Sequence, residues 1–435
     1  MNRQSIRKTF TKYVSLNILG MLGLSCYILA DTYFVAMGIG AEGLAALNLA
    51  IPVYSFINGL GLMVGMGGAT AYAIAGGSGD EEKRQKVFTQ AAGLELAISL
   101  VFFCAGLLVP DRLATLLGAD EQVHAMTESY LRVILLFAPM FMTNNLVICF
   151  VRNDGNPNLS MAAMVLGSFS NIVLDYVFII PLQMGMLGAA VATGIAPVVS
   201  LLILSLHFRK GKSGFGLKKS RPSPVLMGEC AALGVSSLIV EVSAGVVMIV
   251  FNKLVFGAAG NVGIAAYGIL ANIALVITSI FTGIGQGVQP LLSRFFGEGE
   301  ETAVRKIYLY ATVLAVLFAL GIYGICAVFA EPVVSAFNRQ GEAGLEAIAV
   351  RGMRIYFSAF VFAGVNIVTA TFFSAVSKPG KSFAVSVLRG FLVILPMAVF
   401  LASRLGIDGV WLSMPLSEAA VTVVVVLLMG KRKKS

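Results

Sequence analysis

Acidic side chains inside long apolar stretches are the residues of this sequence that could do chemistry. Five carboxylates lie well inside such stretches: Asp31, Glu95, Asp175, Glu241 and Glu418. If these stretches cross a bilayer, each buried charge costs roughly 2.5–3.5 kcal/mol on insertion scales, so an acid there is a functional candidate by default. Carboxylates bind protons and hard cations. The pattern therefore points to ion binding within a membrane.

The composition supports a membrane setting. Of 435 residues, 58% are apolar and 12% charged, and the mean hydropathy is +0.89. A soluble domain is about 45–50% apolar and about 25% charged. This excludes soluble enzymes, nucleic-acid binders and disordered scaffolds, and makes the lipid bilayer the expected partner.

The chain lacks the residues of an enzyme or of a cofactor site. The five cysteines and two histidines show no paired ligand spacing. No nucleophile–base arrangement and no ATP-binding loop stands in a polar segment. We therefore expect no enzymatic activity and no cofactor, and an ion gradient as the energy source.

Twelve apolar stretches are long enough to cross a bilayer, which takes about 20 residues each. They are 13–37, 45–75, 88–109, 128–151, 159–181, 185–208, 227–257, 264–294, 306–330, 350–376, 382–403 and 408–430. With both termini inside, the inner loops and tails hold most of the 31 Lys and Arg, and the outer loops hold only Arg112, Arg339 and Arg404. The positive-inside rule therefore predicts a multi-pass plasma (inner) membrane protein with cytoplasmic termini.

The sequence is duplicated around a basic linker. Gly65, Gly67 and Gly77 recur 220 positions later as Gly285, Gly287 and Gly297, and Asn144 recurs 222 positions later as Asn366. The predicted domains are a six-helix lobe at 1–208, a cytoplasmic linker at 209–226 and a second six-helix lobe at 227–435. An even span count relates the lobes by a pseudo-two-fold axis along the membrane normal. This all-α plan is typical of carriers that rock one bundle against the other, so we expect a monomer.

Asp175 is the acid with the most polar neighbours. Asn171 precedes it by one helical turn on the same face, and Thr193 lies at equal depth across the hairpin around Met184. Asp31 lies at a similar depth, about 10 Å below the outer end of its span at 1.5 Å per residue. Such a set can bind Na⁺ or share a proton. The alternative is that Asn171 and Thr193 only satisfy helix–helix hydrogen bonds.

The second lobe lacks this set, since the counterparts of its members are Phe251, Val393, Met397 and Met414. The coupling ion is therefore expected in the N-terminal lobe. The candidates for a substrate cavity are Glu241, Glu95, Gln286, Gln289, Asn144 and Asn366. Glu95 either lines that cavity or pairs with a neighbouring residue. Glu418 follows a Ser- and Pro-rich helix start and is interpreted as structural.

These residues resemble the multidrug and toxic compound extrusion (MATE) transporters over the whole chain. The resemblance rests on Ala-Asp31-Thr-Tyr-Phe-Val, Gly43-Leu-Ala-Ala, Asn171-x-x-x-Asp175, Thr193, Glu241 and Gly283-x-Gly-Gln-Gly-x-Gln289-Pro. It implies a V-shaped pair of six-helix lobes that exports organic cations in exchange for H⁺ or Na⁺. It places the ion, Na⁺ included, at the positions of Asp31, Asn171, Asp175 and Thr193. Some members carry an acid in span ten, where Gly364 and Asn366 stand here.

The alternative function is a lipid-linked oligosaccharide flippase of the same superfamily. That function predicts extra spans and a cationic cavity for a pyrophosphate group, whereas the sequence has twelve spans and an acid-biased interior. The expected substrates are therefore small lipophilic or cationic molecules.

Overall fold

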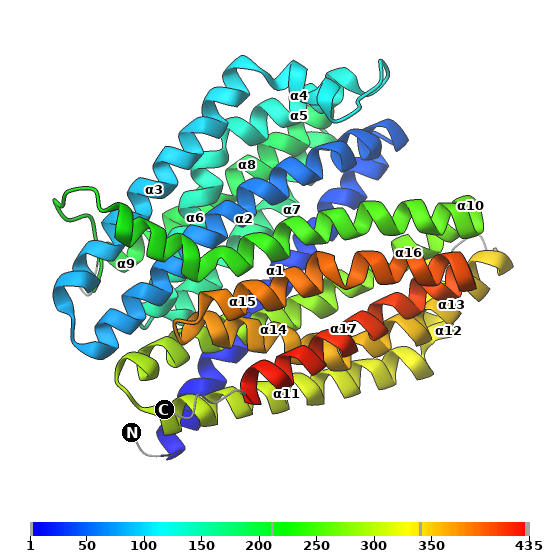
Figure 1. Ribbon diagram of the computed structural model, residues 1–435. Coiled ribbons are helices and arrows are strands. Elements are labelled where there is room, and N and C mark those ends of the chain that lie inside the picture. The colour runs from blue at the N-terminus through cyan, green and yellow to red at the C-terminus, as the bar shows by residue number, and fades with distance from the viewer. Residues whose placement is uncertain (1–2, 210–212, 339–341, 431–435) are drawn as a thin grey trace.

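The computed structural model describes residues 3–209, 213–338 and 342–430, and within these ranges the chain is helical, with no β-strand. Part of the basic linker, the loop with Arg339 and the basic tail 431–435 lie outside the described residues. Figure 1 shows the start of the first helix and the end of the last helix on the same side of the molecule. We call this the termini side.

The N-terminal lobe runs from the first helix to the linker. Its helices are α1 (Arg3–Gly38), α2 (Ala41–Ser78), α3 (Glu81–Leu108), α4 (Pro110–Leu116), α5 (His124–Leu136), α6 (Ala138–Asn153), α7 (Pro157–Ile179), α8 (Gly185–Leu204) and α9 (Leu206–Arg209). Two of these helices, α3 and α7, begin with a side-chain cap. Asp80 accepts a hydrogen bond from the backbone of Lys83 (3.0 Å), and Asn156 caps α7 just before Pro157.

The C-terminal lobe begins with the longest helix. It contains α10 (Pro224–Gly297), α11 (Glu301–Val328), α12 (Ala330–Phe337), α13 (Ala343–Tyr356), η1 (Phe357–Ala359), α14 (Phe360–Ala375), α15 (Pro379–Val387), η2 (Leu388–Leu392), α16 (Ile394–Leu405) and α17 (Ile407–Gly430). The short η2 segment is a π-helix in the middle of a span.

The helices supply twelve membrane spans, as the sequence predicts. At 74 residues, α10 is far longer than one span needs, and Gly260 breaks its helical geometry with a φ of 61°. It therefore forms two spans. The fourth span is α5 and α6 together, bent by 47°, and the tenth is broken at the matching place by η1. The short helices α4 and α12 were not expected from the apolar pattern.

The two lobes pack against each other toward the termini side, where α2 and α10 run along their boundary (Figure 1). A Cβ on Gly67 would lie 2.7 Å from the backbone nitrogen of Gly234, and one on Gly287 would lie 2.9 Å from Cα of Val14. The 220-residue repeat maps the first contact onto the second. Gly77 and Gly297, which the repeat maps onto each other, pack backbone to backbone. These paired contacts are the signature of the pseudo-two-fold axis.

The lobes separate toward the opposite side. A Cβ added to Gly245, Gly257 or Gly268 of α10 would meet no atom within 4 Å. The buried cluster around Val35, Ala46 and Ile134 contains N-lobe residues only. The structure is thus closed on the termini side and open on the other.

The described part of the linker is fastened to the N-lobe. Asp154 accepts hydrogen bonds from Tyr72 Oη (2.6 Å), His207 Nε2 (2.8 Å) and the backbone nitrogen of Gly214 (2.7 Å). Phe215 is buried against Phe88 and a further set of aromatic rings: Tyr72, Phe150, His207 and Phe208. The described part of the linker is therefore packed against the N-lobe.

The glycine contacts predict that Gly77→Ala destabilises the closed termini side. The new Cβ would overlap the carbonyl oxygen of Arg294, so α2 and α10 must move apart at a cost of about 1–3 kcal/mol. Thermal unfolding of the purified protein measures this cost. The control Gly257→Ala adds a methyl where nothing lies within 4 Å, and it should change stability by no more than about 0.5 kcal/mol. Equal effects of the two substitutions would contradict close packing at Gly77.

Candidate functional site

Three helices of the N-lobe bring the predicted coupling residues together. Asp31 lies on α1, Asn171 and Asp175 lie on α7, and Thr193 lies on α8. In the amide orientation that satisfies both neighbours, Asn171 donates a hydrogen bond to Asp175 Oδ2 (3.0 Å) and accepts one from the Thr193 backbone (3.2 Å). Asp31 is near enough to Asp175 for the two carboxylates to interact electrostatically. The four residues predicted from their spacing thus lie in one buried site.

This site contains oxygen atoms that the protein leaves unsatisfied. Oδ1 of Asp31, Oδ1 of Asp175 and Oγ1 of Thr193 are buried and have no hydrogen-bond partner among the described residues. Buried polar atoms are normally paired. Carboxylate and hydroxyl oxygens are hard ligands, so the residues fit a small cation or a proton.

Tyr130 on α5 is a member of the site that sequence reasoning missed. Its side chain lies against Thr193 and close to both carboxylates. Next to Asp31, the hydroxyls of Tyr27 and Tyr54 are hydrogen-bonded to each other at 2.9 Å. Aromatic residues are common in apolar spans, so nothing in the sequence distinguishes these three tyrosines.

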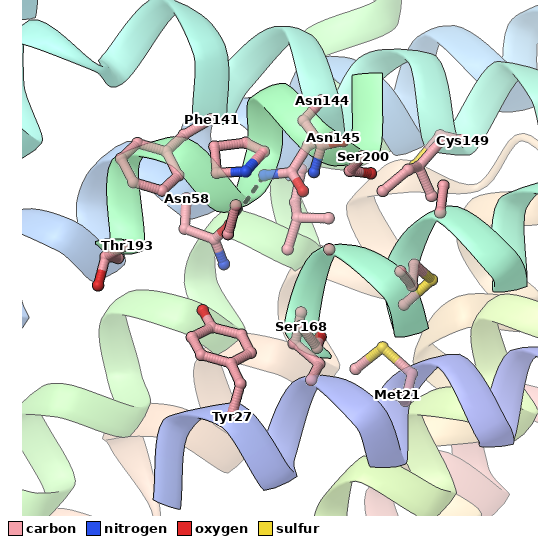
Figure 2. Close-up of a pocket in the computed structure, with 18 of the residues that line it drawn as sticks. Met21, Tyr27, Asn58, Phe141, Asn144, Asn145, Cys149, Ser168, Thr193 and Ser200 are labelled. Atoms are coloured by element: carbon pink, nitrogen blue, oxygen red, sulfur yellow. Dashed lines mark hydrogen bonds between the residues drawn. The ribbon is translucent and has the colours of Figure 1, made fainter. Parts of the chain in front are cut away.

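A cavity connects this site with the boundary between the lobes (Figure 2). Thr193 and Tyr27 line one end, Met21 and Cys149 line the other, and Gln286 also belongs to the lining. The cavity encloses about 100 Å³, whereas sites for drug-sized ligands occupy about 300–1,000 Å³. A small ion and a few water molecules fit there, and a larger molecule requires the space between the lobes.

Glu241 joins this cavity from the C-lobe. Its Oε2 accepts a hydrogen bond from Asn58 Nδ2 (3.2 Å), and Asn58 Oδ1 accepts one from Asn145 (2.8 Å). Among the residues one helical turn before and after Glu241 (237–238 and 244–245), the sequence has Ser237 as the only polar side chain. The hydrogen-bond partner of Glu241 is supplied by the other lobe. Asn144 and Gln286 line the same cavity.

The other three cavity candidates lie elsewhere. Gln289 is completely buried in the contact between the lobes, where it bonds to Thr70 (2.9 Å) and Asn153 (3.0 Å). Glu95 is buried in α3 outside the cavity lining. Asn366 lies in the core of the C-lobe.

The C-lobe core holds a polar network in place of a cavity. Glu418 accepts hydrogen bonds from Arg389 Nε (2.6 Å) and Asn366 Nδ2 (2.7 Å), and Thr422 donates to Asn366 Oδ1 (3.0 Å). The repeat maps Asn366, Arg389 and Glu418 onto Asn144, Gly167 and Pro197, which all line the N-lobe cavity. An internal ion pair therefore fills the position that stays open in the N-lobe.

A bundle of twelve spans in two related lobes, with a buried acidic site in one lobe, defines a membrane carrier. The MatE family model matches residues 17–177 and 233–400 of the chain. The chain therefore belongs to the family of MATE transporters, which confirms the resemblance found in the sequence.

Individual relatives agree with this assignment. The multidrug export protein MepA of Staphylococcus aureus (strain MRSA252) is 25% identical over 416 residues, which cover 94% of this chain and 90% of MepA. MepA of Staphylococcus saprophyticus is 24% identical over 419 residues, with the same coverage.

Solved structures share the fold. An outward-facing multidrug resistance MATE family transporter of the MOP superfamily superimposes with a TM-score of 0.91 at 26% identity, covering 97% of this chain and 95% of that one. A MOP superfamily transporter from Pyrococcus furiosus, described as having a binding pocket of reverse polarity, gives a TM-score of 0.90 at 26% identity with the same coverage.

The C-lobe network predicts that Glu418→Ala is strongly destabilising. Removing one partner of a buried ion pair costs about 3–5 kcal/mol, whereas replacing both by apolar residues is often neutral. Thermal unfolding of Glu418→Ala should therefore show a large loss that the double substitution Arg389→Met with Glu418→Leu mostly restores. If the double variant is as unstable as the single one, the pair does more than fill the core.

Proposed function

We propose that this transporter exports lipophilic organic cations across the plasma membrane in exchange for H⁺ or Na⁺, which binds at Asp31, Asn171, Asp175 and Thr193. The observation that carries the proposal is the buried site with three unsatisfied oxygens in the N-lobe. The cavity that leads from this site to the lobe boundary supports it. The multidrug export named for MepA supports the substrate class.

The direction of transport follows from the charge distribution. Basic residues are concentrated in the loops and tails on the termini side, so the positive-inside rule makes this side cytoplasmic. The lobes are closed there and open on the other side, which corresponds to an outward-facing state. In this state, ions from outside reach the N-lobe site while the substrate leaves.

The chemistry of the cavity favours cations. Glu241 contributes a carboxylate, Tyr27, Tyr54 and Phe141 contribute aromatic rings, and none of the lining residues is Lys or Arg. Cations are attracted to carboxylates and to aromatic faces. A lipid-linked pyrophosphate would require the opposite charge, so the flippase function is not favoured.

An ion can drive export only by favouring one conformation over the other. The available free energy is about 2.3 kcal/mol per charge per 100 mV plus about 1.4 kcal/mol for each tenfold ion gradient. One or two ions per cycle thus suffice for a substrate gradient of roughly a hundredfold. For H⁺, two adjacent carboxylates resist ionising together, so one of them readily holds a proton. For Na⁺, both stay ionised and Asn171 and Thr193 add neutral oxygens.

The proposal predicts that Asp175→Asn and Asp31→Asn each abolish gradient-driven export while the protein remains folded and inserted. Each substitution removes a charge from the ion site and keeps the side-chain shape. Efflux of an ethidium-like dye from cells measures the loss, and exposed Asp111→Asn serves as the control. Dye binding against pH, with and without Na⁺, then separates the two ions. Export at the parent rate by both Asn variants would refute the N-lobe coupling site.

A second prediction concerns substrate selection by Glu241. Its carboxylate faces the cavity across the lobe boundary and bonds only to the neutral Asn58, so it is available to attract a cation. Glu241→Gln should lower the export of cationic dyes by about tenfold, equivalent to about 1.4 kcal/mol, and spare neutral substrates. Transport assays with a cationic and a neutral dye of similar size measure the ratio. An equal loss for both dyes would contradict this role.

A further inference from the structure

Arg152 is a buried positive charge at the boundary between the lobes. Its side chain is in the interior near the end of α6, with 1% of the residue exposed. Nη1 donates to Asn17 Oδ1 (2.6 Å) and Gln286 Oε1 (3.3 Å), and Nε has no partner. Within the described ranges no carboxylate forms an ion pair with it. Burying a guanidinium without a counter-ion costs free energy. The hydrogen bonds from its neutral partners are therefore needed to stabilise it.

Those partners depend on the closed termini side. Gln286 belongs to α10 of the C-lobe, and Asn17 of α1 donates its own hydrogen bond to the carbonyl oxygen of Gly283, also on α10 (3.0 Å). When the lobes part on this side, Gln286 moves away from Arg152 and Asn17 loses Gly283. Opening therefore removes much of what stabilises the guanidinium in this conformation.

Glu95 on the neighbouring helix α3 is a buried acid that lacks a partner. It is 2% exposed, and neither carboxylate oxygen has a hydrogen-bond partner among the residues that the structure describes. An ionised carboxylate in such surroundings is strongly disfavoured.

Cys149, about one helical turn before Arg152 on α6, is near both residues. Nη2 of Arg152 is 3.7 Å from its Sγ atom, and the Glu95 carboxyl group is near enough to the same thiol to interact electrostatically. Glu95 and Arg152 thus stand on two packed helices, α3 and α6, and have Cys149 as a shared neighbour. Cys149 also lines the cavity shown in Figure 2.

We propose that Glu95 is a second proton-binding site, and that Arg152 displaces its proton when the termini side opens. While that side is closed, neutral Glu95 carries the proton and Arg152 binds Asn17 and Gln286. On opening, Arg152 forms an ion pair with Glu95, and the proton passes to water on the termini side. The step conserves charge, since one O–H bond breaks and one proton leaves. The inference rests on the proposed export function, because each cycle then carries a proton inward.

Other charged groups near α3 already have partners or lie far along the helices. The elements packed against α3 are α2, α4, α5, α6 and α10. At the termini side Lys83 pairs with Glu229 of α10 (2.8 Å), and toward the opposite side Arg132 of α5 pairs with Glu128. The remaining titratable groups on these elements are Glu42, Tyr54 and Tyr72 on α2, Asp111 and Arg112 on α4, His124 and Tyr130 on α5, Cys149 on α6, and Cys230, Glu241, Lys253, Tyr267 and Arg294 on α10. Among the Lys and Arg residues of these five helices, only Arg152 is buried, so it is the cation that we assign to Glu95.

The test measures opening of the termini side through a native thiol. Cys26, Cys104, Cys149 and Cys326 are replaced by serine, which leaves the buried Cys230. Cys230 packs in the core cluster that joins the lobes. The labelling rate by a maleimide is measured from pH 5.5 to 8.5 and divided by the rate for the denatured chain at the same pH. In the parent this ratio should rise with pH at least about fivefold, as expected for a site coupled to a conformational change.

Variants of Glu95 and Arg152 test whether these residues respond to pH or only support the fold. Glu95→Gln should give a low ratio that does not change with pH, because the side chain cannot form the ion pair. Arg152→Gln should also remove the pH response, and Arg152→Lys should keep it. Exposed Glu82→Gln on the same helix is the matched control. A rise with pH in either Glu95→Gln or Arg152→Gln, or no rise in the parent, would overturn the proposal.

The outcome is independent of the N-lobe coupling site. If Glu95→Gln responds to pH like the parent while Asp175→Asn abolishes dye export, the proton site at Glu95 is wrong and the proposed function stands. If the Glu95 and Arg152 variants behave as expected but both Asn variants of the N-lobe site export dye normally, the coupling role of Asp31 and Asp175 is wrong instead.

Discussion

The close approach of α2 and α10 on the termini side is the constraint on which the rest of the structure depends. Two helices can touch backbone to backbone only where side chains are absent, and Gly67, Gly77, Gly234 and Gly297 provide this at the lobe boundary. Because the contact lies on the pseudo-two-fold axis, it holds both lobes at one end and leaves them free at the other. The cavity, the Glu241 contact across the boundary and the Arg152 cluster all lie along the line where the lobes meet.

The duplicated lobes have diverged in their cores. In the N-lobe, small residues such as Gly167 leave room beside Asn144, and the carboxylates of Asp31 and Asp175 keep unsatisfied oxygens. In the C-lobe, the same space is occupied by Arg389 and Glu418, which neutralise each other. Carboxylate oxygens are thus unsatisfied in the described core of the N-lobe, whereas Glu418 in the core of the C-lobe is paired with Arg389. Under the proposed function, ion binding at Asp31 and Asp175 would act on the N-lobe.

Helical periodicity and the repeat were enough to predict the spans, the two lobes and the four residues that meet in the N-lobe. Asn171 and Asp175 share a helix face, and the hairpin placed Thr193 beside them, so short-range geometry sufficed. Contacts between helices that are far apart in the sequence could not be predicted from it. The partner of Glu241 is on α2 of the other lobe, and Tyr130 reaches the site only because α5 packs against α8. Arg152 carries no local signal either, since its position at the end of a span is typical of a residue that reaches the membrane surface.

Rocking about the termini side requires that each lobe keep its own shape. In the N-lobe, Asp154 gathers hydrogen bonds from α2, α9 and the linker, so that Tyr72, His207 and Gly214 move together. In the C-lobe, Glu418 connects α14, η2 and α17 through Asn366 and Arg389. Buried charges with several partners resist rearrangement, because any movement that breaks one bond leaves a charge unsatisfied. Glu95 and Arg152 have no charged partner in this state, and the described Asp31 and Asp175 of the N-lobe site also lack one. The described chain thus holds buried acids with several partners inside each lobe, and a buried guanidinium with neutral partners at the boundary between the lobes.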